Sequence, residues 1–192
     1  MHLIGITGFI GSGKTTVGQL LKDMGYVVFD MDVWCRKMYF EKAFLEVIKQ
    51  NFPQSFEGGV FNKKKLRQIV FKDEKQLKKL ESLTHPYLKS KLLKAIHKNR
   101  FNSYLFFVET ALLFQMELDK YCRQVILTTA PYDVMEKRVI LRDKIKAEDF
   151  KNIYDKQKID LFGKSFYDIN TYQSINTLKT DVIRFLESFE QC

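Results

Sequence analysis

Short apolar runs alternate with longer stretches of helical periodicity along this chain. The runs are continuous rather than alternating, which is typical of parallel strands that helices cover on both faces. We therefore expect an α/β fold of the P-loop NTPase type, in which helices flank a parallel sheet. The expected strands are Leu3–Thr7, Tyr26–Phe29, Tyr104–Val108, Gln124–Thr128 and Phe166–Asn170.

Helices are expected between these strands. The first begins inside a glycine-rich loop and ends near Gly25, a residue suited to a left-handed cap. Asp73 and Gln76 resemble a capping box for a later helix, which Pro86 is expected to break or kink. The last helix shows apolar residues at helical spacing behind Ser174, its expected cap.

Loop lengths suggest one domain with two additions. The nucleotide-binding core is expected to cover about 1–33, 101–142 and 165–192. Residues 34–100 are too long for a simple crossover, so we expect a helical insertion there. Residues 143–164 are basic and lack strand signals, which favours a lid.

Composition and charge limit the classes of ligand and the cellular location that we expect. Across 192 residues the formal net charge is +9, and the lysines are scattered as on the wet faces of helices. Small anionic ligands fit this surface at least as well as nucleic acid does. Three widely spaced cysteines indicate neither a disulfide framework nor a zinc site. With no expected membrane span or leader segment, we expect a cytoplasmic protein.

The first loop carries the most specific motif. Residues 8–15, GFIGSGKT, match G-x-x-x-x-G-K-[ST] at every fixed position, directly after an expected strand. The glycines let backbone N–H groups converge on phosphate oxygens at the positive end of the next helix. This P-loop predicts a nucleoside triphosphate site in which Lys14 reaches the β and γ phosphates and Thr15 ligates Mg²⁺. The expected nucleotide-binding residues are Gly11, Ser12, Gly13, Lys14, Thr15 and Thr16.

A P-loop alone does not separate kinases from GTPases or ATPases. The chain has neither an N-K-x-D motif nor a D-x-x-G switch, which disfavours a GTPase. Asp30 and Asp32 instead follow the second expected strand, at the edge where open α/β sheets bind ligands. We expect these two carboxylates to face the phosphate loop.

Five segments in order resemble the dephospho-coenzyme A kinase family. They are GITGFIGSGKTTV, FDMDVWCRKM (D-A-D-x-x-x-R), LTHPYLK (I-T-H-P), VETALLFQ (D/E-x-P-L-L-F-E) and EKRVILRD (R-x-x-x-R-D), and the resemblance spans residues 3 to about 178. It implies transfer of the ATP γ-phosphate to the 3′-hydroxyl of dephospho-coenzyme A, with Mg²⁺. It also implies that the insertion binds the acceptor and that the lid closes on it.

The resemblance gives roles to single residues. Asp32 corresponds to the carboxylate that takes the acceptor hydroxyl's proton, although a helix cap is its competing role. An aspartate of ordinary pKa, about 3.9, accepts that proton only late, as the transition state forms. Asp30 is expected to position Mg²⁺ or brace the loop, and Arg36, four residues after Asp32, to hold substrate phosphate.

Four further residues complete the expected site. Glu109 ends the third strand, where a carboxylate reaches the metal shell. Arg138 and Arg142 lie four residues apart and are expected to act on the transferring phosphoryl group, surface ion pairs being the competing role. His85 is expected to shape the substrate-side helix.

The chain departs from the family pattern at Ala111 and Gln115, where proline and glutamate are usual. Another P-loop kinase acting on a nucleoside or nucleotide stays open as an alternative. An ATP-dependent nucleic-acid-binding module is a weaker one, since no basic stripe with interleaved aromatic residues is present.

Overall fold

The computed structural model describes residues 2–101, 104–157, 159, 161 and 163–190. The expected lid positions 158, 160 and 162, and Cys192, lie outside these residues. The chain divides into two compact units, one formed by residues 1–30 and 96–192 and the other by residues 31–95. Among the described residues, none of the helices is long and apolar enough to cross a membrane.

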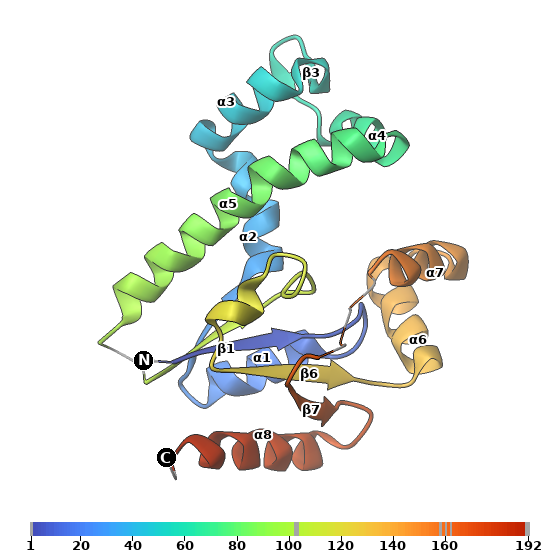
Figure 1. Cartoon of the computed structure of the whole chain (residues 1–192). Helices are drawn as coiled ribbons and strands as arrows, with labels where there is room; N and C mark the ends of the chain where they lie inside the picture. The colour runs from blue at the N-terminus through green and yellow to red at the C-terminus, as the bar shows by residue number, and fades with distance from the viewer. Residues whose placement is uncertain (1, 102–103, 158, 160, 162, 191–192) are drawn as a thin grey trace. The chain divides into compact units, whose positions relative to one another are not determined.

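The first unit is an α/β layer structure (Figure 1). Its elements are β1 (His2–Thr7), α1 (Lys14–Asp23), β2 (Val27–Asp30), β5 (Leu105–Glu109), η3 (Leu118–Tyr121), β6 (Gln124–Thr129), α6 (Tyr132–Asp143), α7 (Ala147–Lys156), β7 (Tyr167–Asn170) and α8 (Ile175–Glu190). The strands pair in the order β2-β5-β1-β6-β7, and every pair is parallel. The expected parallel sheet is therefore confirmed, with each strand within about one residue of its predicted bounds.

Successive side chains of each strand point to opposite faces of this sheet. Ile4 and Ile6 of β1 pack against α1 and α8, whose apolar residues complete the main core. Gly5 turns to the other face, where an added Cβ would lie 2.8 Å from Leu113. Ser174 accepts a hydrogen bond from the Thr177 N–H at 3.2 Å, which confirms the expected cap of α8.

The second unit is mainly helical (Figure 1). It holds α2 (Met31–Lys37), η1 (Met38–Phe40), α3 (Lys42–Asn51), η2 (Pro53–Ser55), β3 (Phe56–Glu57), β4 (Val60–Phe61), α4 (Lys63–Lys72) and most of α5 (Glu74–Asn99). Asp73 accepts a hydrogen bond from the Lys75 N–H at 2.8 Å at the start of α5.

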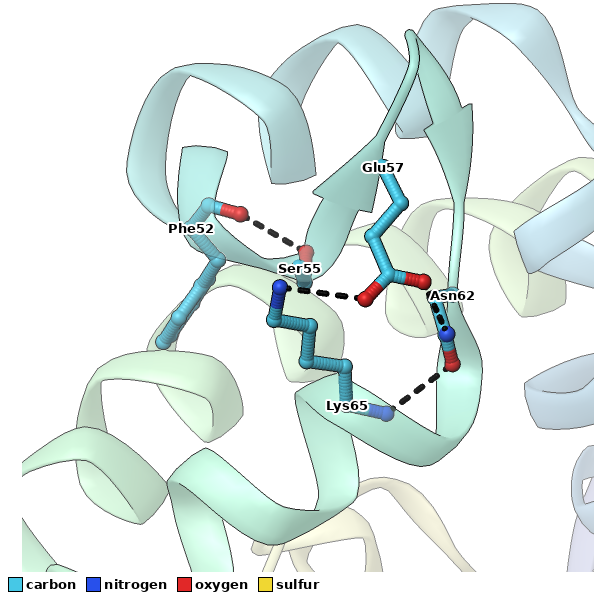
Figure 2. Close-up of polar contacts among 5 residues, drawn as sticks. All are labelled: Phe52, Ser55, Glu57, Asn62 and Lys65. Atoms are coloured by element: carbon cyan, nitrogen blue, oxygen red, sulfur yellow. Dashed lines mark hydrogen bonds and ion pairs between the residues drawn. The ribbon is translucent and has the colours of Figure 1, made fainter.

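Polar side chains form hydrogen bonds around the short hairpin of β3 and β4, as Figure 2 shows. The Glu57 carboxylate accepts hydrogen bonds from Asn62 at 2.7 Å and from Lys65 Nζ at 3.2 Å. Asn62 also caps α4 by accepting the Lys65 N–H at 3.1 Å. One amide side chain therefore joins the hairpin to the next helix.

Pro86 does not break its helix, so that alternative is wrong. α5 runs continuously from Glu74 to Asn99 with Pro86 inside it. A proline there removes one backbone hydrogen bond. Burial of Thr84, Leu88 and Leu92 on the same helix offsets this local cost.

Candidate active site

The P-loop joins β1 to α1 and curls through two left-handed glycines. Gly11 has φ +80° and Gly13 has φ +90°, a region that side chains rarely adopt. A Cβ on Gly11 would lie 2.6 Å from the Met135 carbonyl oxygen, and one on Gly13 would lie 2.7 Å from Thr171 Oγ1. Both glycines are thus required by backbone angle and by space.

Lys14 is held against the loop that precedes it. Its ammonium donates to the Gly8 carbonyl at 2.9 Å and the Phe9 carbonyl at 3.0 Å, and the side chain is buried. These bonds fix a positive charge beside the N-terminus of α1, which is the positive end of the helix dipole. The arrangement suits an anion with several oxygens.

Two oxygen-bearing side chains that were expected at the metal site meet at the start of α1. Thr15 Oγ1 donates to Glu109 Oε1 at 2.7 Å, and the Glu109 side chain is buried. Asp30 pairs with Glu109 in the register of β2 and β5, so its backbone lies at the same sheet edge.

This donor set fits Mg²⁺, which proteins usually hold through one or two oxygen ligands together with substrate phosphates. Among the described residues, no group of three or more His, Cys, Asp or Glu side chains suits a metal ion.

Ser12 and Thr16 complete the expected nucleotide-binding set. Ser12 Oγ lies 2.7 Å from Thr128 Oγ1, which donates to the Thr7 carbonyl at 3.1 Å. The Ser12 hydroxyl is therefore turned to the sheet. Thr16 is exposed in the first turn of α1, and its N–H donates to the Gly13 carbonyl at 3.0 Å.

The two expected arginines lie on α6 in different surroundings. Arg138 donates to the Gly11 carbonyl at 3.2 Å and to both oxygens of Thr171 at 2.9 Å. Arg142 forms two 2.8 Å hydrogen bonds with the adjacent Asp143 carboxylate near the surface. Only Arg138 contacts the P-loop through these bonds, and it does so through backbone oxygen.

The remaining expected residues belong to the second unit. Asp32 lies in the first turn of α2, where the helix dipole favours a carboxylate, and Arg36 lies in its last turn. Asp32 and burial both raise the pKa of the Cys35 thiol, burial being the larger cause. Burial lowers the pKa of His85 on α5, although Glu81 opposes this shift, and the lowered pKa favours the neutral imidazole.

The residues that contact the P-loop and were not expected to do so include three from the chain beyond α6. Tyr154 lies in α7, Gln157 directly follows α7, and Thr171 directly follows β7. The Tyr154 ring stacks on Phe9 with centroids 4.6 Å apart, and Gln157 Oε1 accepts the Ile10 N–H at 2.7 Å. Thr171 follows directly after a strand, which is the one signal that pointed to it.

This sheet order, with a glycine loop after its central strand and a lysine and threonine opening the next helix, defines a P-loop nucleotide-binding protein. The family model for dephospho-CoA kinase matches residues 2–160. The chain belongs to the dephospho-CoA kinase family.

Individual relatives agree with this assignment. A dephospho-CoA kinase from Aquifex aeolicus is 38% identical over 161 residues, covering 82% of this chain and 81% of the relative. One from Fusobacterium nucleatum is 30% identical over 190 residues, covering 97% of each. A crystal structure of a Thermus thermophilus protein superposes with a TM-score of 0.82 at 28% identity, over 99% of this chain and 96% of that one.

Proposed function

We propose that this protein transfers the γ-phosphoryl group of ATP to the 3′-hydroxyl of dephospho-coenzyme A, the last step of coenzyme A synthesis. The observation that carries the proposal is a formed P-loop cradle in a chain whose residues 2–160 match the dephospho-CoA kinase family. A cytoplasmic location and the absence of nucleic acid as a partner stay predictions from sequence.

In the proposed reaction, the acceptor 3′-oxygen forms a bond to the γ-phosphorus as the bond to the β–γ bridging oxygen breaks. Asp32 orients the hydroxyl and takes its proton, and ADP leaves with the bridging oxygen. The Lys14 ammonium stabilises charge on the β and γ phosphates.

Thr15 and Glu109 are the residues that fit Mg²⁺, with Asp30 at the same edge of the sheet. When bound, this ion neutralises charge that develops on the phosphate oxygens. Arg36 and His85 are assigned to the acceptor, and Arg138 and Arg142 to the phosphates. A lid at about residues 143–164 and an acceptor-binding insertion at about 34–100 complete the proposal.

A substrate panel tests the acceptor. Purified protein with Mg-ATP is offered dephospho-coenzyme A, adenosine or AMP, and the products are identified by mass. We expect an 80 Da mass increase on dephospho-coenzyme A alone. Efficient phosphorylation of adenosine or AMP with none of dephospho-coenzyme A would assign the chain to another class of P-loop kinase.

Two variants test the assigned roles. Asp32→Asn removes the proton acceptor at nearly constant size, so we expect ATP affinity to persist while kcat falls by about 10² or more. Lys14→Ala is expected to weaken both binding and turnover. Unchanged kcat in the Asp32→Asn protein would remove that carboxylate from the mechanism.

A further inference from the structure

Thr171 lies where the last strand of the sheet meets the P-loop. It follows β7 directly, is 4% exposed, and its N–H donates to the Thr129 carbonyl at 2.8 Å. Its hydroxyl donates to the Ser12 carbonyl at 2.8 Å and accepts from Arg138 at 2.9 Å. The same guanidinium donates to the Gly11 carbonyl at 3.2 Å.

These contacts fix the direction of two successive loop carbonyls. In a trans peptide the C=O and the following N–H point in opposite directions. The Ser12 carbonyl points to Thr171, so the Gly13 N–H points away from it. The Thr171 side chain also fills the space beside Gly13, where an added Cβ would come within 2.8 Å of three of its atoms. Thr171 therefore packs directly against the loop at Gly13.

We propose that Thr171 is a positioning residue for nucleotide binding, which aims the Gly13 N–H at the phosphates through the Ser12 carbonyl. The inference rests on the proposed function, since it assumes that phosphates occupy the P-loop. A hydroxyl is suited to the position because it donates to Ser12 and accepts from Arg138 at the same time. Without it, the buried Ser12 carbonyl loses this donor and the loop can rotate that peptide.

Three variants separate this role from packing. Thr171→Val keeps the branched shape and removes the hydroxyl with its contacts to Ser12, Arg138 and, at 3.2 Å, the Thr129 carbonyl, whereas Thr171→Ser keeps the hydroxyl. Thr129→Val is the matched control, because that hydroxyl donates to Asp168 at 2.7 Å rather than to the loop. The readouts are the Kd for ADP by calorimetry with no acceptor present, the KM for each substrate, and the melting temperature.

We expect Thr171→Val to weaken ADP binding about tenfold, as the loss of a buried hydrogen bond implies. The KM for ATP rises with it, and the KM for dephospho-coenzyme A stays constant. Thr171→Ser and Thr129→Val are expected to bind ADP within about twofold of the parent protein. If the valine protein does not fold, Thr171→Ala removes the same hydroxyl and carries the same expectation.

A folded Thr171→Val protein with parental ADP affinity would overturn the inference, even if its melting temperature fell. Failure of serine to restore binding would also overturn it. If the parent protein binds ADP but does not phosphorylate dephospho-coenzyme A, the proposed acceptor is wrong. The loss of ADP affinity in Thr171→Val then still supports the inference.

Discussion

Substituting alanine for Gly13 tests whether the shape of the P-loop depends on the side chain that packs against it, Thr171. Gly13 has φ +90°, and a new Cβ would lie 2.7 Å from Thr171 Oγ1 and 2.8 Å from two Thr171 carbons. Gly25, beyond the end of α1, has φ +91° and nothing within 4 Å of a new Cβ. The two positions therefore share a backbone angle and differ in crowding.

The expected magnitudes follow from that difference. A left-handed alanine costs about 1–2 kcal/mol at either position. Overpacking adds about 1–3 kcal/mol at Gly13, because Thr171 is held by its hydrogen bonds. We thus expect the free energy of unfolding to fall by about 2–5 kcal/mol for Gly13→Ala and by about 1–2 kcal/mol for Gly25→Ala.

Urea unfolding and ADP calorimetry measure both consequences. If the loop relieves the clash by moving, its N–H groups lose their common focus, so ADP affinity is expected to fall at least about 30-fold in Gly13→Ala. Gly25→Ala is expected to bind ADP like the parent. Equal destabilisation of the two variants, with normal ADP binding in both, would show that contact with Thr171 does not determine the shape of the loop.

Further predictions concern α7, the metal and one ion pair. Tyr154→Ala removes the stack on Phe9, worth about 0.5–1.5 kcal/mol, so amide exchange within α7 should accelerate; unchanged protection would count against the contact. Thr15→Val should raise the Mg²⁺ concentration for half-maximal activity at least tenfold, and an unchanged requirement would remove that hydroxyl from the site. The hydrogen bond from Lys91 lowers the pKa of Glu41 below its usual 4.5, so its stabilisation is complete above pH 4.5 and is lost as the pH falls through the folded-state pKa. Glu41→Gln should therefore lower the free energy of unfolding by about 0.2–1 kcal/mol at pH 7 and by less at pH 3, and a loss that does not depend on pH would contradict this.

The sheet could be predicted because buried parallel strands have an unmistakable pattern. The runs Leu3–Ile6 and Leu105–Val108 contain no polar residue that would face water, as is typical of strands covered on both faces. Whether Pro86 breaks its helix is harder to predict, because the answer depends on tertiary packing that the local sequence does not reveal. Three buried residues within one or two turns of it keep α5 continuous.

The residues on the phosphate-binding side of the P-loop could be predicted from the sequence. The residues that pack on its opposite side could not. Lys14, Thr15 and Glu109 follow from motif spacing and from the ends of strands. Thr171 and Gln157 approach the loop from 159 and 147 positions away. Their contacts depend on β7 lying beside β6, an order that the sequence pattern leaves open.

The first two of the four variable positions after Gly8 illustrate why the side of the loop away from the phosphate site carries information of its own. The motif leaves both residues unspecified, since the phosphates are bound by backbone N–H groups and Lys14. Here they are Phe9 and Ile10, which pack with Met135 and Val139 of α6 in a second apolar cluster. A loop free to vary on this side can attach to the helices that follow β6 without altering its phosphate-binding side. A movement of α7 is therefore transmitted directly to the P-loop, through the stack of Tyr154 on Phe9 and the hydrogen bond from the Ile10 N–H to Gln157.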